Sequence, residues 1–266
     1  MTLTTTNLMD SVSVDDTLAR GVLYRALKVG FQPPEESSLD SIFSADGKEA
    51  LKQAAALLDA DRGGALSDVV ERLCVLPEPW AEELRQTYER LFGHTLRGRV
   101  CPYECEYGRN PLLQQAHQLA DLAGFYAAFG LRAASDHGER VDHVACEIEF
   151  LEFLSIKEVV ALQLEERDGW QVTREAARQF LREHLARFGR AFARNLKAEA
   201  PPGFYLVLAE LCEVFLGFEC DRLGVPLGPE LLAVRPEEAE DVPMACGSES
   251  VVQIGGGSAW GVPELE

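Results

Sequence analysis

Hydrophobic residues recur along most of the chain at three- and four-residue steps, the spacing that places them on one face of an α-helix. The first run predicts a helix from Asp15 to Phe31, with Ser13 or Asp15 as its N-cap. The other predicted helices are Ser38–Phe43 as a short turn, Lys48–Asp59, Ser67–Val75 with Ser67 as its cap, a helix after Pro79 that ends at Gly93, Pro111–Gly130, Asp142–Arg167, a helix from Gln171 or Thr173 to Ala198, and Gly203–Leu223. The alternation typical of strands is not found. We therefore predict an all-α fold, a compact single-domain bundle of unequal helices.

The pattern changes near Leu232. An acidic segment with prolines at both ends is followed by a Gly-Gly-Gly-Ser run and a lone Trp260. This composition is typical of flexible chains. Residues 1–232 are therefore predicted to form the helical domain and residues 233–266 a flexible C-terminal tail. The sequence leaves open whether the tail folds back through Val251, Val252, Ile254 and Trp260.

Charge narrows the classes of partner. The chain has 25 Lys and Arg against 44 Asp and Glu, a formal net charge of −19. This excess of acid disfavours nucleic acid and anionic membranes, and it attracts a positively charged protein or peptide. The N-terminus lacks the basic and apolar regions of a signal peptide, and Glu210 and Glu213 interrupt the most apolar stretch. We expect a cytoplasmic protein without stable membrane insertion.

The sequence contains none of the catalytic motifs considered for a helical protein of this size. The Glu-x-x-His of di-iron bundles, the His-Glu-x-x-His of zinc peptidases, a P-loop and Gly-x-Ser-x-Gly are all absent from the sequence. We therefore predict that the protein is not an enzyme and holds no cofactor. The alternative is a metal- or cofactor-handling protein that uses Cys101 and Cys105, with Cys74 or Cys146 as further ligands. A closed metal site usually needs a second close pair, so most of the seven cysteines are interpreted as reduced core residues.

Five short motifs remain, and they occur in a fixed order. They are Tyr88-Glu-Arg-Leu91-Phe92-Gly93, Pro102-Tyr103-Glu104-Cys105-Glu106-Tyr107, Asp142-His143, Glu147-Ile-Glu149-Phe150 and the segment Phe180–Phe188. In order and spacing, over about Asp15–Gly224, the chain resembles the TorD/DmsD/NarJ family of molybdoenzyme maturation chaperones. Three positions depart from the family pattern, because Cys105 stands where the family has Ser, and Cys101 and Val141 stand where it has Pro.

The resemblance implies a cytoplasmic, client-specific chaperone with an all-α fold. Such a chaperone binds the apo catalytic subunit of a molybdopterin-dependent oxidoreductase through its twin-arginine leader or its N-terminus. It assists cofactor insertion and assembly before export.

A twin-arginine leader presents two guanidinium groups and then an apolar stretch. Guanidinium groups pair with carboxylates through two parallel hydrogen bonds, and tyrosine can stack on them. The predicted binding residues are therefore Glu104, Glu106, Asp142 and His143 as the polar part, with Tyr88, Leu91, Phe92, Tyr103 and Tyr107 as the apolar wall. Binding driven by this much acid is expected to be salt-sensitive.

Each assignment has a structural alternative. Asp142 can cap the helix after it, His143 can bond across the loop, and Glu104 can pair with Arg97 or Arg109. The residues Tyr88, Leu91 and Phe92 can be core. Glu147 and Glu149, two positions apart, cannot share one helix face, so one is expected outside and the other bonded inside. His184 is interpreted as a packed core histidine. A third reading of the chain is an acidic scaffold whose tail does the binding.

Overall fold

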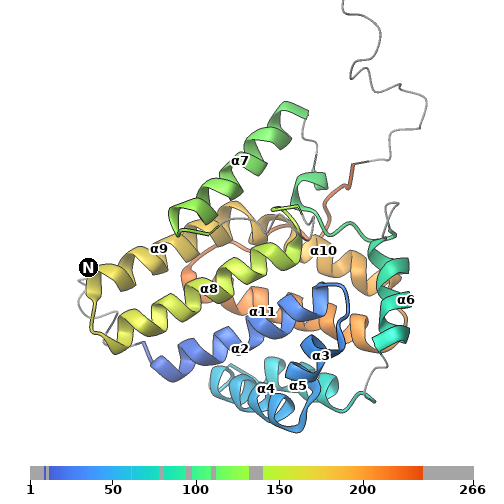
Figure 1. Ribbon diagram of the computed structural model, residues 1–266, viewed down its shortest axis with the longest axis horizontal. Coiled ribbons are helices and arrows are strands. Elements are labelled where there is room, and N and C mark those ends of the chain that lie inside the picture. Colours follow the sequence, from blue (N-terminus) through green and yellow to red (C-terminus); the bar gives the residue numbers. More distant parts are fainter. Residues whose placement is uncertain are drawn as a thin grey trace, which may run out of the picture. The chain divides into compact units, whose positions relative to one another are not determined.

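The protein is described by a computed structural model, which covers residues 9, 12–60, 62–77, 81–93, 98–108, 112–131 and 140–235 (Figure 1). The helices are α2 (Val14–Phe31), α3 (Glu36–Phe43), α4 (Ala45–Leu58), α5 (Ala65–Cys74), α6 (Ala81–Phe92), α7 (Leu112–Ala128), α8 (Val144–Gln163), α9 (Arg167–Glu183), α10 (Leu185–Glu199) and α11 (Phe204–Leu223), with one 3₁₀ turn, η1 (Glu104–Glu106). The described residues form no β-sheet and make only isolated bridges. The all-α prediction is confirmed.

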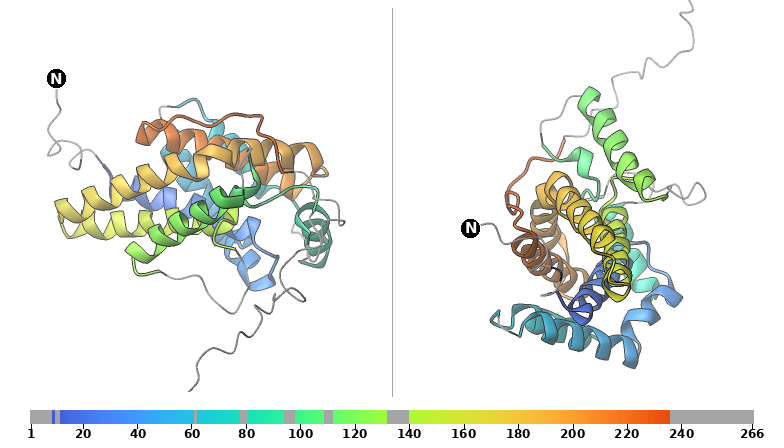
Figure 2. Two further views of the ribbon diagram at one scale, coloured as in Figure 1. Left: turned by 90° about the horizontal axis from the view of Figure 1, so that it is seen from above. Right: turned by 90° about the vertical axis from the view of Figure 1, so that its left-hand side faces the viewer.

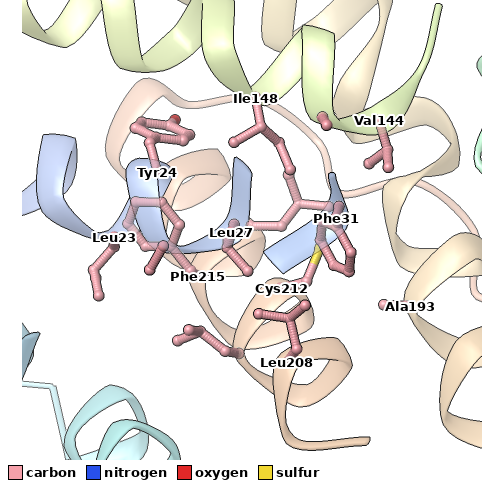
Figure 3. Packing of buried hydrophobic residues seen from close by; sticks show 14 of the residues in the cluster. Leu23, Tyr24, Leu27, Phe31, Val144, Ile148, Ala193, Leu208, Cys212 and Phe215 are labelled. Carbon is pink, nitrogen blue, oxygen red and sulfur yellow. The ribbon is translucent and has the colours of Figure 1, made fainter. Parts of the chain in front are cut away.

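Helix α2 lies at the centre of the bundle, between α8 and α11. Its residues Leu23, Tyr24 and Phe31 pack among side chains of α8, α10 and α11 (Figure 3). A Cβ on Gly30 would lie 2.6 Å from Leu208 Cδ2, so glycine is what allows α2 and α11 to approach here. Helices α4 and α5 lie on the opposite side of the bundle from α7 (Figure 2).

Local chemistry explains where several helices begin. Ser13 caps α2, because its hydroxyl accepts hydrogen bonds from the backbone N–H groups of Asp15 and Asp16. The prediction that Ser67 caps α5 is wrong. This helix begins after Gly64, which has φ +83°. The backbone N–H of Ser67 instead donates to the Asp59 carboxylate at 2.7 Å.

The single helix predicted from Gln171 or Thr173 to Ala198 is wrong. The structure has two helices there, α9 and α10, and the helical backbone is interrupted at His184, whose φ and ψ are −123° and −97°. The apolar stripe runs through the break without interruption, because Phe180, Leu181, Leu185 and Phe188 are all buried. Periodicity alone therefore could not reveal it.

None of the described helices has both the length and the apolar character that crossing a membrane requires. The chain divides into two units, residues 1–235 and residues 236–266. The second unit, with Val251, Val252, Ile254 and Trp260, lies outside the described residues. The predicted boundary at residue 232 stays a prediction.

Candidate functional site

The two loop segments predicted to form one site lie side by side. The backbone N–H of Glu104 donates to the carbonyl of Asp142 at 2.9 Å, and that of Val144 donates to the carbonyl of Pro102 at 2.8 Å. Tyr103 and His143 form an antiparallel bridge between these bonds. This short pairing fixes η1 against the start of α8 (Figure 1).

Asp142 is fully buried and holds the two segments together. Its carboxylate accepts from the backbone N–H of Cys105 at 3.2 Å, and from Nε and Nη2 of Arg140 at 2.9 and 2.8 Å. The alternative that Asp142 caps α8 is wrong, because the cap is His143, whose Nδ1 accepts from the N–H of Ala145 at 3.1 Å. Burial lowers the pKa of His143 to about 4, so the ring is neutral and able to accept this bond.

Glu104 is also buried, 2% exposed, and joins η1 to the break between α9 and α10. Its Oε2 lies 3.0 Å from His184 Nδ1, and its Oε1 accepts from Arg187 Nη1 at 3.2 Å. His184 is thus packed, as expected, and also bonded to the candidate site. The alternative partners Arg97 and Arg109 lie outside the described residues.

Glu106 is half-buried and completes the group. Its carboxylate accepts from Arg140 Nη1 at 3.2 Å and from the Gln115 amide at 3.3 Å, and it lies 3.8 Å from Arg235 Nε. The Arg140 guanidinium, which bonds both Glu106 and Asp142, stands over the Tyr103 ring with its carbon 4.5 Å from the ring centroid. We call Glu104, Glu106, Asp142 and their partners Arg140, Arg187 and His184 the acidic cluster.

The acidic cluster is therefore neutralised from within the chain. Sequence reasoning identified the carboxylates but missed Arg140 and Arg187. Each has a weak signal in the sequence, since Arg140 stands two residues before Asp142, and Arg187 lies inside the Phe180–Phe188 motif. Neither position shows which carboxylate the arginine pairs with.

The predicted apolar wall is mostly core. Tyr88, Leu91, Phe92 and Tyr107 are each at most 7% exposed, and the Tyr107 hydroxyl donates to the carbonyl of Cys101 at 2.8 Å. Tyr103 is half-buried. A ligand at the surface can therefore contact Tyr103, and Tyr107 lines a hollow described below, whereas Tyr88 and Phe92 pack in the core against Tyr205.

Glu147 has the most unusual surroundings of the carboxyl groups. It is fully buried on α8, and neither of its carboxylate oxygens has a hydrogen-bond partner. Burial, together with the negative charges of Glu104 and Asp142, raises its pKa well above the ordinary value. Glu149 is exposed, so the predicted division of the two glutamates is confirmed, but the expected internal hydrogen bond is not there.

A hollow of about 320 Å³ opens beside the acidic cluster. Glu104, Tyr107, Arg187 and Phe188 form one side of it, and residues 226–229 with Leu232 form the other. Its wall combines a buried carboxylate, two arginines and apolar side chains. Such a mixture suits a peptide better than a small apolar ligand.

The described cysteines give no support to a metal centre. Cys74, Cys101, Cys105, Cys212 and Cys220 are buried, Cys146 is half-buried, and no disulfide joins them. Burial and the nearby Asp142 raise the pKa of Cys105 far above its ordinary value, which keeps it a thiol. Within the part of the chain that the structure describes, no three His, Cys, Asp or Glu residues are placed to hold a metal ion.

Comparisons with known proteins find one family and three relatives that this chain resembles. The model of the nitrate reductase delta subunit family matches residues 49–194. The selenate reductase assembly chaperone protein of Thauera selenatis is 34% identical over 188 residues, 68% of this chain and 93% of the relative. The perchlorate reductase assembly chaperone protein of Dechloromonas aromatica (strain RCB) is 24% identical over 79% of this chain and 92% of its own length. The chlorate reductase assembly chaperone protein of Ideonella dechloratans is 37% identical over 35% of this chain and 44% of its own length.

Proposed function

Since the chain belongs to the nitrate reductase delta subunit family, of the NarJ/TorD type that its motifs resemble, we propose that it is an assembly chaperone for the catalytic subunit of a molybdopterin-dependent oxidoreductase. It acts by binding the apo subunit, not by catalysing a reaction. The observation that carries the proposal is the 34% identity to the selenate reductase assembly chaperone over nearly the whole of that relative. The other two relatives are also named as assembly chaperones of oxyanion reductases.

The client segment that we propose is a basic leader or N-terminus, bound at the acidic cluster and the hollow beside it. The guanidinium of Arg140 indicates how the binding works. It bonds Asp142 and Glu106 and stacks on Tyr103, while its side chain stays 37% exposed. A client arginine that replaced it would find the same three partners in place. The apolar part of the client segment would then lie in the hollow along Phe188 and Leu227.

Binding at this place would serve assembly in the cytoplasm. A chaperone that occupies the client's leader delays export, and one that contacts the unfinished subunit keeps it open for cofactor insertion. Both steps are part of the proposal.

Co-purification tests the function. A tagged full-length chain, expressed in its source organism while the reductase is being made, is expected to recover the cofactor-free catalytic subunit. In a strain without the chain, the subunit is expected to accumulate with little molybdenum cofactor. Recovery of no reductase subunit, together with normal cofactor content in the deletion strain, would contradict the proposal.

A pair of matched substitutions tests the site. Glu106→Gln removes a carboxylate that is half-buried in the acidic cluster, whereas Glu149→Gln removes an exposed carboxylate from α8. We expect the first variant to bind a synthetic leader peptide about tenfold more weakly, the loss expected when a charged hydrogen bond is removed. The second is expected to bind like the wild type. Equal binding by the wild type and both variants would show that the client binds at another surface.

A further inference from the structure

A second hollow, of about 390 Å³, opens between α2, the end of α4, α9 and α11. Four arginines line it, namely Arg20, Arg62, Arg174 and Arg222. It shares no lining residue with the hollow beside the acidic cluster. The chain has a net charge of −19, so the gathering of four arginines at one hollow is not explained by its overall composition.

Two buried glutamates hold three of these arginines in place. Glu158 accepts from Arg20 Nη2 at 2.8 Å and from the Trp170 indole N–H at 3.1 Å, and lies 3.8 Å from Arg174 Nη1. Glu219 accepts from Nε and Nη2 of Arg222 at 2.8 and 2.7 Å, and from the Tyr24 hydroxyl at 2.8 Å. Both carboxylates are therefore supplied with donors, and the arginine side chains are fixed before any ligand arrives.

Among the described residues, the carboxylates are fewer than the arginines. Asp16 is the acid among the described lining residues, and with Glu158 and Glu219 behind the wall it makes three carboxylates for four guanidinium groups. Burial would raise the pKa of Glu219, but Arg222 and Arg20 hold it below the ordinary value, so this acid is ionised. Burial, and then the nearby charge of Arg222, lower the pKa of Arg174. Arg174 thus lies in a partly buried place that it shares with the charges of Arg222 and Arg20.

Donor groups remain unused as well. Arg222 bonds Glu219 through Nε and Nη2, which turns Nη1 away from that carboxylate, and Nη1 has no hydrogen-bond partner. The Nε of Arg20 is also buried, and its nearest carboxylate oxygen, Glu219 Oε1, lies 3.7 Å away, beyond hydrogen-bond distance. Unpaired donors of this kind are costly unless an anion or water can reach them.

We propose that this hollow is a binding site for a phosphate group, in the form of a diphosphate or a phosphate ester of a small molecule. Guanidinium forks match phosphate oxygens in geometry, and several of them converge here on one space. The volume is within the range of small-ligand sites. Arg62, which is exposed and stands over the Phe218 ring at 4.4 Å, lies at the entrance, and Arg174 lies on the wall.

Calorimetry on the full-length chain tests the proposal, with pyrophosphate, ADP and sulfate as probes. Pyrophosphate is expected to bind with one site per chain and to raise the unfolding temperature. Tighter binding of ADP than of pyrophosphate would identify an organic phosphate ester as the ligand, and equal binding would identify the diphosphate group alone. Absence of binding by both, or sulfate binding as tight as pyrophosphate, would overturn the proposal.

Substitutions locate the binding. Arg62→Gln and Arg174→Gln each remove one guanidinium while leaving the Arg20–Glu158 and Arg222–Glu219 pairs intact. We expect each to weaken pyrophosphate binding about tenfold, the effect of losing one charged hydrogen bond. Arg178→Gln, one turn further along α9 and outside the hollow, is the matched control and is expected to bind like the wild type. Unchanged binding by the Arg62→Gln, Arg174→Gln double variant would place the anion elsewhere and overturn the assignment.

Discussion

Glu147 is a buried acid whose protonated form the fold favours. Both of its oxygens lack hydrogen-bond partners, and the nearby carboxylates of Glu104 and Asp142 add to the cost of burying a negative charge there. Its pKa is raised above the value in the unfolded chain. As pH rises past the unfolded pKa of about 4.3, the unfolded state therefore loses its proton first, and the folded state loses stability until its own pKa is reached.

The variant Glu147→Gln removes this pH dependence, because its amide does not ionise. Urea unfolding from pH 5 to pH 8 is expected to show wild-type stability falling relative to the variant by up to about 1.4 kcal/mol per pH unit within that window. Glu149→Gln, on the exposed face of the same helix, is the control and is expected to follow the wild type. Parallel curves for Glu147→Gln and the wild type would show that Glu147 ionises freely in the folded protein.

His143 acts in the opposite direction. Its pKa is lowered to about 4 by burial, below the unfolded value of about 6.5. The stability that its neutral ring provides is therefore present above pH 6.5 and is lost as pH falls toward 4.

Substitution separates the cap of His143 from its titration. His143→Ala loses the bond to the Ala145 N–H and is expected to cost about 1 kcal/mol at pH 7.5. His143→Asn keeps an acceptor at the cap and is expected to lose less unfolding free energy than His143→Ala. Because asparagine does not titrate, the stability of this variant is expected to fall less steeply than that of the wild type between pH 6.5 and pH 4. Thermal unfolding over this range measures both effects, and equal acid sensitivity of wild type and Asn variant would contradict the assignment.

The elements could be predicted well where a local signal marks them. Ser13 before an apolar-periodic run fixed the start of α2, and Pro201-Pro202 fixed the end of α10 near Glu199. The break at His184 could not be predicted, because no glycine or proline marks it and the apolar stripe continues. It depends on a distant residue, Glu104, which binds both His184 and Arg187.

We therefore expect Glu104 to stabilise the junction of α9 and α10. Glu104→Ala leaves the buried His184 Nδ1 without this partner and removes the carboxylate partner of Arg187, which keeps its bond to the Glu183 carbonyl, and is expected to cost about 2 kcal/mol of unfolding free energy. Hydrogen exchange should increase at residues 183–188 more than in α2. The matched control is Asp121→Asn, since Asp121 is exposed and lies 3.5 Å from His184 Nε2 without a hydrogen bond. A uniform increase in exchange would mean that Glu104 supports the whole fold and not this junction.

For the whole molecule, composition gives the net charge but not how the charge is distributed over the fold. The sequence shows an excess of acid and three carboxylates in two loops. The fold pairs those carboxylates with Arg140, Arg187 and Arg235, and it gathers four other arginines at the second hollow. Apart from Arg140 and Asp142, which are two residues apart, these pairings join residues far apart in the chain, so no local pattern records them. The family motifs that carry Glu104 and Asp142 lie in loops that meet in space, and whether the client binds at these loops stays a prediction.

The position at which the folded unit ends near its C-terminus can be tested by truncation. The predicted domain ends at residue 232, yet the Ala233 carbonyl accepts from the Gly108 N–H at 2.7 Å, and the Arg235 N–H donates to the Glu106 carbonyl at 2.8 Å. Val234 forms a bridge with Tyr107 between these bonds. Residues 233–235 therefore brace the loop that carries Glu104 and Glu106.

A chain that ends at Arg235 is expected to keep the unfolding free energy and the client affinity of the full-length protein. A chain that ends at Leu232 loses both backbone bonds and the Arg235 side chain, and is expected to be less stable by about 2 kcal/mol, at about 1 kcal/mol per bond. Its client binding should weaken as well, because Glu106 loses two of its contacts, the backbone bond from Arg235 and the nearby Arg235 guanidinium. Urea unfolding and leader-peptide titration measure the two quantities on each chain. If the chain that ends at Arg235 folds normally but no longer binds the client, the acidic tail is the binding element, and the acidic cluster serves only to join α8, α9 and α10.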